Sequence, residues 1–273
     1  MRECFTNNSV KIENIECFDL SLTLDCGQAF RWNRQQDGSW KGIAFGREIE
    51  ALQNGNTITI KGTNKEDYET IWCRYFDLER DYKNLCISFC EDETMCAAIK
   101  TYPGIRILQQ EPWEALCSFI ISQNNNIPRI KGIIDRLCAC FGDKLNGGGY
   151  SFPSAERLSG LTVEDLSPLR AGFRAKYMLD AAKKVSSSEV DLQRLGDMAI
   201  DEARTELIKI KGVGAKVAEC TLLYGCGRMH AFPVDVWVKR VMNEIYPNGL
   251  PECILGNEGI AQQYLFHWRR NLK

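Results

Sequence analysis

The sequence predicts an α+β fold, with an N-terminal antiparallel β-sheet domain that carries helices, followed by a mostly α-helical region. Three observations predict this. Alternating runs with turn signals fill the first 65 positions, the hydrophobic period then changes toward 3.6 residues, and helical patterns fill the remainder. We place the boundary so that residues 1–105 form the sheet domain with its packing helices and residues 106–273 form the helical region.

The N-terminal sheet is predicted from three segments. The segments "SLTLDCGQAFRW" and "SWKGIAFGREIEALQ" alternate as strands do, and "QNGNTITIKG" adds a turn of the primed type at Asn54-Gly55, which favours a hairpin. From about Asp67, "EDYETIWCRYFDLERDYKNL" and "DETMCAAIKTY" have helical spacing. We therefore expect two amphipathic helices packed on the sheet.

From Glu111 onward the pattern is almost entirely helical. The segment "EPWEALCSFIIS" predicts an apolar helix, "QNNN" interrupts it, and "IPRIKGIIDRLCACFG" resumes with Pro128 in a first turn, where proline is tolerated. A capping box runs from Thr162 to Asp165, and "RAKYMLDAAKKVSS" and "DEARTELIKI" predict two further helices.

Composition narrows the protein class. The 273 residues are 44% apolar and 26% charged, as in ordinary globular proteins, with no membrane-spanning run and no signal-peptide core. We expect the 13 cysteines to be reduced thiols in a cytosolic setting, because a chain this long does not need disulfide staples. Residues 1–100 carry a net charge of −5 and the remainder +3, which permits a DNA-facing C-terminal part without demanding one.

The stretch "TELIKI-KGVGA-KVAECTLLYG" predicts a helix, a glycine hairpin and a second helix. Gly212 and Gly214 flank Val213, and glycine allows positive φ and removes side chains. A phosphate can then approach the N–H groups at the start of the second helix, which holds DNA by its backbone without reading sequence. The alternative is a simple turn between two helices with a glycine cap.

Lys216 lies in the first turn of that second helix, where the helix dipole disfavours a cation. Its neighbours in sequence are small and apolar, and Cys220 lies one turn further on the same face. Dipole and partial burial both favour the neutral amine, which is a nucleophile that forms Schiff bases. The alternative is a surface lysine that extends into solvent.

Asp235 precedes the periodic run in "FPVDVWVKRVM", at the position of an N-cap. Hydrogen bonds from backbone N–H groups favour the ionised carboxylate, which suits stabilising a cation better than accepting a proton. An amine nucleophile with a fixed carboxylate fits chemistry through an oxocarbenium-like sugar. Taken alone, Asp235 could be only a cap.

Five ordered motifs carry a family resemblance. "IKGVGAKVAEC…FPVDV" resembles the helix-hairpin-helix, Gly-Pro-Asp superfamily of DNA glycosylases, and "DCGQAFRW", "PWEALCSFIISQNNNIPRI", "FRAKYM" and "AQQYLF" resemble the eukaryotic-type 8-oxoguanine DNA glycosylases over nearly the whole chain. The resemblance implies a base-excision repair enzyme with DNA N-glycosylase and abasic-site lyase activities. In that family, the lysine matching Lys216 attacks the sugar C1′ and the aspartate matching Asp235 stabilises the developing positive charge. Strand cleavage then follows by β-elimination.

The resemblance also implies a base pocket. The glycine matching Gly27 accepts, through its carbonyl, the N7–H that 8-oxoguanine has and guanine lacks. A normal guanine would leave an acceptor facing an acceptor. The residues matching Cys220 and Phe266 sandwich the flipped base, and the glutamine matching Gln262 bonds its Watson–Crick edge.

A further implied set contacts the DNA around the flipped nucleotide. The residue matching Asn124 fills the vacated space, and those matching Arg129 and Arg174 read the orphaned cytosine with rigid forks of donors. The sequence departs from the family at two positions. The wedge tyrosine is Phe173, which puts opposite-base stringency in doubt, and a common histidine is Trp237, so a phosphate contact is replaced by apolar packing.

The expected partner is double-stranded DNA containing 8-oxoguanine opposite cytosine, bound by a monomer without membrane attachment. No cofactor and no metal are expected. Only Cys253 lies beyond Asp235, which excludes a four-cysteine iron–sulfur cluster there, and Cys86, Cys90 and Cys96 lack a CxxC pair. The expected compartment is the cytoplasm, associated with the nucleoid in a prokaryote, or the nucleus in a eukaryote.

Two alternatives stay open. A non-catalytic helix-hairpin-helix DNA-binding protein would not need Lys216 or Asp235. A glycosylase for other damaged purines would not need Gly27, Gln262 and the "NNN…R" stretch as they stand in this sequence.

Overall fold

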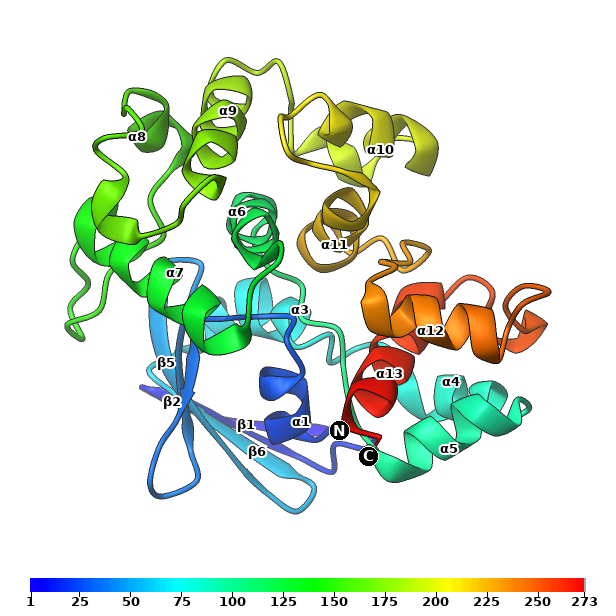
Figure 1. The fold of residues 1–273 in the computed structure, drawn as a ribbon. Coiled ribbons are helices and arrows are strands. Elements are labelled where there is room, and N and C mark those ends of the chain that lie inside the picture. The colour runs from blue at the N-terminus through cyan, green and yellow to red at the C-terminus, as the bar shows by residue number, and fades with distance from the viewer. Residues whose placement is uncertain (273) are drawn as a thin grey trace.

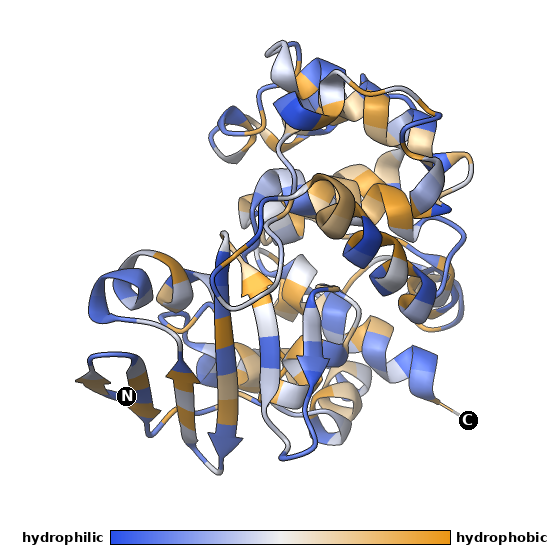
Figure 2. Cartoon of the chain, turned by 90° about the vertical axis from the view of Figure 1, so that its left-hand side faces the viewer, coloured by the Kyte–Doolittle hydropathy of each residue, from blue (hydrophilic) through white to orange (hydrophobic). Residues whose placement is uncertain are grey.

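A computed structural model describes residues 1–272 of the chain (Figure 1). Its N-terminal part is an antiparallel sheet of six strands in the order β1-β2-β6-β5-β4-β3. The strands are β1 (Arg2–Thr6), β2 (Ser9–Glu13), β3 (Trp32–Arg34), β4 (Trp40–Ala44), β5 (Arg47–Asn54) and β6 (Thr57–Lys61). Figure 2 shows hydrophilic and hydrophobic positions alternating along these strands. The predicted sheet is therefore confirmed.

Glycine turns set the register of the sheet. Phe45 and Gly46 both have positive φ and join β4 to β5 as a type I′ turn. The primed turn predicted at Asn54-Gly55 is present, but its central residues are Gly55 and Asn56. The reason is that Asn54 still pairs with Thr57, and Gly55 supplies the positive φ of 56°.

The predicted strand in "SLTLDCGQAFRW" is wrong over most of its length. Leu20–Asp25 form helix α1, and only β3 follows as a strand. The Asp19 side chain accepts the N–H of Leu22 at 2.7 Å and caps this helix. Four alternating residues suit either structure, and the cap decides for the helix.

The first predicted helix divides into two parts. The first part consists of α2 (Lys65–Asp67), a π-helical turn (Tyr68–Trp72) and α3 (Cys73–Tyr75). It ends where Asp77 adopts a positive φ of 49°. The chain then forms α4 (Tyr82–Phe89), capped by Asp81, and the second predicted helix is confirmed as α5 (Glu93–Thr101).

The helical region is confirmed. Its α-helices are α6 (Pro112–Ser122), α7 (Ile127–Phe141), α8 (Ala155–Ser159), α9 (Arg174–Ser186), α10 (Ile200–Ile208), α11 (Ala215–Cys226), α12 (Val236–Glu244) and α13 (Glu258–Asn271). Thr162 and Asp165 exchange the hydrogen bonds of the predicted capping box, although a turn and a 3₁₀ segment follow rather than an α-helix. Along residues 1–272, every helix falls short of the length and apolarity that crossing a bilayer requires.

The hydrophobic side chains form two clusters. One lies on the sheet with α1 and α3, and its large aromatic members include Trp32, Trp72, Tyr75 and Phe76. The other fills the helical region and includes Phe89 of α4 and other residues of α4 and α5. The expectation that two helices pack on the sheet is confirmed for the part of the first predicted helix that contains Trp72 and Tyr75, because both lie in the sheet cluster. It is wrong for α4 and α5, which belong to the helical cluster, where α5 packs against α13 and α4 against α5 and the 3₁₀ turn Glu252–Ile254 (Figure 1). The boundary at 105/106 stays a prediction.

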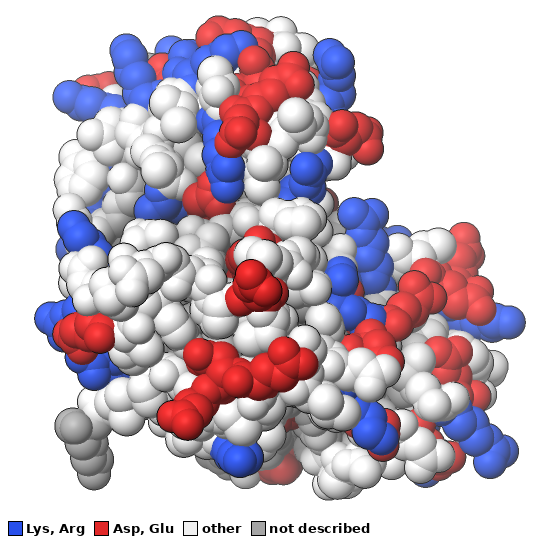
Figure 3. Space-filling model, turned by 90° about the vertical axis from the view of Figure 1, so that its right-hand side faces the viewer, with Lys and Arg blue, Asp and Glu red and all other residues white. Residues whose placement is uncertain are grey.

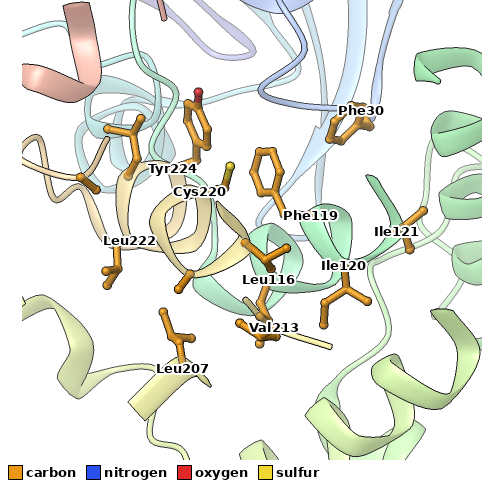
Figure 4. Close-up of a cluster of buried hydrophobic side chains, with 14 of the residues drawn as sticks. Phe30, Leu116, Phe119, Ile120, Ile121, Leu207, Val213, Cys220, Leu222 and Tyr224 are labelled. Carbon is orange, nitrogen blue, oxygen red and sulfur yellow. The ribbon is translucent and has the colours of Figure 1, made fainter. Parts of the chain in front are cut away.

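Helix α6 is the centre of the helical region and is buried on nearly all sides, which explains its apolar sequence. Helix α11 crosses it closely. A Cβ at Gly225 would lie 2.9 Å from the Cα of Pro112, so only glycine allows this approach. Figure 4 shows the side chains of both helices meeting, with Phe119 beside Cys220 and Tyr224. This contact fixes the helix that carries Lys216.

Candidate active site and DNA-binding cleft

The hairpin lies between α10 and α11, as predicted. Gly212 has φ +78°, and a Cβ there would lie 2.2 Å from the Tyr177 ring. Gly214 is extended, with φ −98°, so positive φ occurs at Gly212 only. The Val213 N–H donates to the carbonyl of Ile210 at 3.0 Å and is not free for a phosphate.

The phosphate-binding capacity lies instead in the first turn of α11. Gly214 is its N-cap, and no side chain caps the helix. The first N–H groups of a helix have no partner within it, so those of this turn face outward without a capping acceptor. Gly214 is exposed, and the position of its missing Cβ has nothing within 4 Å. A phosphate oxygen could approach here.

Lys216 is the second residue of α11 and is half-buried. Its Nζ lies 5.0 Å from the centre of the Phe119 ring and 3.4 Å from Ser122 Oγ. Phe119 in turn stacks on Tyr224 at 5.2 Å, so the amine rests against a rigid aromatic floor. The described residues place no carboxylate within 4.0 Å of the amine.

Asp235 caps α12, as predicted. Its Oδ1 accepts the N–H groups of Trp237 at 2.9 Å and Val238 at 2.8 Å. Asp235 and Lys216 line the same cleft, whose volume is about 760 Å³. Asn124 of the "QNNN" loop lines the same cleft. The two predicted catalytic side chains therefore share one open space with a predicted DNA contact.

A smaller pocket adjoins the cleft. Lys216 and Asp235 line it together with all four predicted pocket residues, Gly27, Cys220, Gln262 and Phe266. The Gln262 side chain is buried, and its Oε1 has no hydrogen-bond partner. Because a buried polar atom normally has a partner, this orphaned oxygen marks a ligand position. The pocket measures about 60 Å³, enough for a few water molecules but not for a purine base.

Cys220 forms a wall of this pocket. Burial raises the pKa of its thiol to about 11, although Lys216 opposes the shift. The thiol is therefore neutral at physiological pH and does not compete with the amine as a nucleophile.

Gly27 has φ +86°, and its loop is held firmly. The fully buried Gln28 donates to the carbonyls of Thr23 and Arg106, both at 2.8 Å, and accepts the N–H of Leu108 at 2.9 Å. These bonds join the loop to the segment before α6. The Gly27 carbonyl is thus fixed before any base arrives.

The predicted opposite-base residues lie around one loop. Asn124 is exposed with φ +47°, a conformation that asparagine tolerates, and Phe173 is 49% exposed at the start of α9. Arg129, on α7, is exposed. Arg174 differs, because it is 3% exposed and donates to the carbonyls of Ala171, Gln123 and Asn124. In this structure Arg174 anchors the loop rather than presenting free donors.

Four further side chains line the site or lie beside it. Trp237 lines the cleft, and Arg240 stacks on it at 4.8 Å. Glu219 and Arg270 were not predicted from sequence. Glu219 is a single acid in the apolar run of α11, which was the available signal, and Arg270 is one of two adjacent arginines near the C-terminus.

Among residues 1–272, no group of three or more His, Cys, Asp or Glu side chains could hold a metal ion, and all described cysteines are free thiols.

Figure 3 shows the right-hand side of the molecule, where acidic side chains form broad patches among basic ones. Such a face offers no continuous basic surface to a phosphate backbone.

The hairpin, the first-turn lysine and the capping aspartate on one cleft define a DNA base-excision glycosylase. The family described as "HhH-GPD superfamily base excision DNA repair protein" matches residues 117–250, and "8-oxoguanine DNA glycosylase, N-terminal domain" matches residues 9–116. The chain belongs to the 8-oxoguanine DNA glycosylase family.

Three relatives support this assignment. The 8-oxoguanine glycosylase/lyase of Clostridium acetobutylicum, solved with double-stranded DNA containing cytosine opposite 8-oxoguanine, is 37% identical. The two structures superpose with a TM-score of 0.93, and the match covers 99% of this chain and 98% of the Clostridium chain. MBOgg1, solved with a low-affinity DNA ligand, is 41% identical with a TM-score of 0.93 and 99% coverage of both chains. The N-glycosylase/DNA lyase of Saccharomyces cerevisiae is 36% identical over 83% of this chain and 68% of its own.

Proposed function

We propose that this protein removes 8-oxoguanine opposite cytosine from duplex DNA and then cleaves the strand, as a bifunctional DNA N-glycosylase and abasic-site lyase. The carrying observation is that Lys216, Asp235 and the orphaned Gln262 Oε1 meet at one cleft and its adjoining pocket. A DNA-binding module would have no use for an amine, a carboxylate and an unsatisfied amide oxygen at one point.

The chemistry follows from the two side chains at the cleft. The neutral amine of Lys216 attacks C1′ of the flipped nucleotide, the N-glycosidic bond breaks, and the base departs with its bonding electrons and takes up a proton. Asp235 stabilises the positive charge that develops on the sugar before attack. Its two backbone hydrogen bonds hold the carboxylate in place throughout.

Strand cleavage uses the same lysine. The amine adduct loses a proton and opens the sugar ring to a Schiff base between Nζ and C1′. Loss of a C2′ proton then expels the 3′ phosphate by β-elimination, and hydrolysis of the Schiff base returns Lys216 to its starting state.

Recognition of the oxidised base rests on Gly27 and Gln262. The Gly27 carbonyl, held by the buried Gln28, would accept N7–H of 8-oxoguanine, and Gln262 would bond the Watson–Crick edge. A guanine lacks N7–H, so the carbonyl would face an acceptor and lose its bond. For the base to enter, the pocket must widen, because its volume of about 60 Å³ is too small for a purine.

Borohydride trapping tests the proposal. Duplexes with 8-oxoguanine opposite each of the four bases are incubated with the protein, and the reductant fixes any Schiff base as a covalent adduct. We expect strongest trapping opposite cytosine, and no adduct with Lys216→Gln. Robust strand cleavage by that variant would overturn the nucleophile assignment. Equal trapping opposite all four bases would overturn the cytosine preference.

The other damaged purines are tested in the same assay. Excision of an alkylated purine in preference to 8-oxoguanine would place the protein with the alternative substrate class. In the cell, we place the protein where its DNA lies, at the nucleoid of a prokaryote or in the nucleus of a eukaryote.

A further inference from the structure

Arg270, on the last turns of α13, is a charged side chain in the cleft that the mechanism does not use. It lines the cleft that contains Lys216 and Asp235, and its guanidinium stacks over the Phe266 ring at 5.1 Å. Its Nη1 lies 3.5 Å from where a Cβ of Gly27 would be. Arg270 therefore stands at the mouth of the base pocket.

The guanidinium has no protein partner among the described residues, neither a hydrogen bond nor an ion pair. The adjacent Arg269 differs, because its Nη2 pairs with Glu244 Oε2 at 2.5 Å. Arg174 differs as well, because it donates to three carbonyls. Five donors on a half-buried side chain without an acceptor indicate that the acceptor is the ligand.

The position of Arg270 favours a phosphate over the base. It lines the open cleft but not the enclosed pocket formed by Cys220, Gln262 and Phe266. The flat face of Phe266 orients the guanidinium, and a planar fork with fixed direction suits the oxygens of a phosphodiester. Trp237, which lines the same cleft, offers no cation of its own.

We infer that Arg270 binds a phosphodiester next to the flipped nucleotide and holds the backbone while the base occupies the pocket. This rests on the proposed function, since it requires a nucleotide flipped into the cleft. Lys216 and Arg270 are the two cations that line the cleft. Lys216 must be uncharged to attack, so Arg270 provides the lasting positive charge beside the sugar.

The test is a substitution cycle on binding. In the Lys216→Gln background, which cannot form a Schiff base, affinity is measured for 8-oxoguanine duplexes in which one phosphate at a time is a neutral methylphosphonate. We expect Arg270→Gln to weaken binding about tenfold and to reduce the log–log salt slope by about 0.9, the effect of one lost phosphate contact. At one flanking position, the methylphosphonate should weaken the Arg270 protein but not the Arg270→Gln protein.

Two comparisons sharpen the result. Arg269→Gln, on the same helix but paired with Glu244, should change neither affinity nor salt slope. Arg270→Gln should lose the same factor on a duplex with an abasic analogue, because a phosphate contact does not need the base. Two results would overturn the inference. One is that Arg270→Gln and the methylphosphonate weaken binding additively at every phosphate position, and the other is that Arg270→Gln weakens binding only to duplexes that contain 8-oxoguanine. Failure of the proposed function would show separately, as absence of trapping by the unaltered protein.

Discussion

Glu219 accepts the backbone N–H of Phe232 at 2.6 Å and so ties helix α11, which carries Lys216, to the segment that leads into Asp235. The other oxygen of Glu219 pairs with Arg204 on α10. One buried carboxylate therefore links the first helix of the hairpin motif, the helix of Lys216 and the segment that leads into Asp235. Between Phe232 and Asp235, Pro233 lines the base pocket.

Replacing Glu219 with alanine should remove the link between α10, α11 and the segment that leads into Asp235. The Phe232 N–H would lose its partner, and we expect the free energy of unfolding to fall by about 2 kcal/mol. Asp235 would also be placed less well, so the single-turnover excision rate at saturating DNA should fall about tenfold. Urea denaturation and rapid-quench excision assays measure the two effects.

Glu219→Gln keeps an acceptor for Phe232 and should restore most of the excision rate. Asp201→Asn is the control, because it removes the exposed second partner of Arg204 and leaves Glu219 intact. Excision at the original rate by Glu219→Ala would contradict a positioning role.

Features that depend on neighbouring residues were predictable from sequence. The hairpin, the placement of Lys216 in a first turn and the cap at Asp235 all follow from local patterns, and the structure contains each of them. The error at α1 has a local cause too, because "SLTL" fits both periods and the weight of the Asp19 cap was missed.

Features that depend on distant residues were not predictable. Arg174 donates a hydrogen bond to the carbonyl of Gln123, which lies 51 positions earlier in the chain. Glu219 accepts the N–H of Phe232 only because the chain turns back after α11. Likewise, α4 and α5 belong to the helical cluster rather than to the sheet that precedes them, and α5 packs against α13. Hydrophobic spacing identifies the buried face of such a helix but does not identify its partner.

The two hairpin glycines should respond differently to alanine. Gly212→Ala places a methyl group 2.2 Å from the Tyr177 ring at a positive φ, so we expect a loss of about 2–3 kcal/mol of stability. Gly214→Ala meets open space at an ordinary φ, so its stability should change by less than about 0.5 kcal/mol. Its methyl group would instead obstruct a phosphate at the start of α11, so DNA affinity should fall several-fold.

Thermal denaturation and fluorescence anisotropy on the two alanine variants separate these effects. The reverse pattern, a stable Gly212→Ala protein and an unstable Gly214→Ala protein, would show that the hairpin is held differently.

Alanine substitutions at Arg129 and Arg174 should differ in their effect on stability. Arg129 is exposed, so Arg129→Ala should leave stability unchanged while reducing the preference for cytosine opposite the lesion. Arg174→Ala removes hydrogen bonds to three backbone carbonyls at a buried site. We therefore expect its free energy of unfolding to fall by about 2–4 kcal/mol, in addition to a reduced preference for cytosine. Trapping opposite each base, with urea denaturation in parallel, gives both quantities. An Arg174→Ala protein of full stability would mean that the anchoring bonds contribute little.

His267 should make the protein less stable in acid. The ring is 7% exposed against Tyr102, and burial, aided by the charge of Arg270, lowers its pKa from 6.5 to about 4. Between those two values the unfolded chain takes up a proton that the folded chain does not, so stability falls as pH drops from 6.5 toward 4. At pH 5 the loss should be about 1–2 kcal/mol after allowance for partial screening by solvent. His267→Leu removes the titrating ring, together with its buried Nδ1, which has no hydrogen-bond partner. The difference in unfolding free energy between pH 7.5 and pH 5 should therefore shrink in the variant. An equal difference in both proteins would show that other groups cause the acid sensitivity.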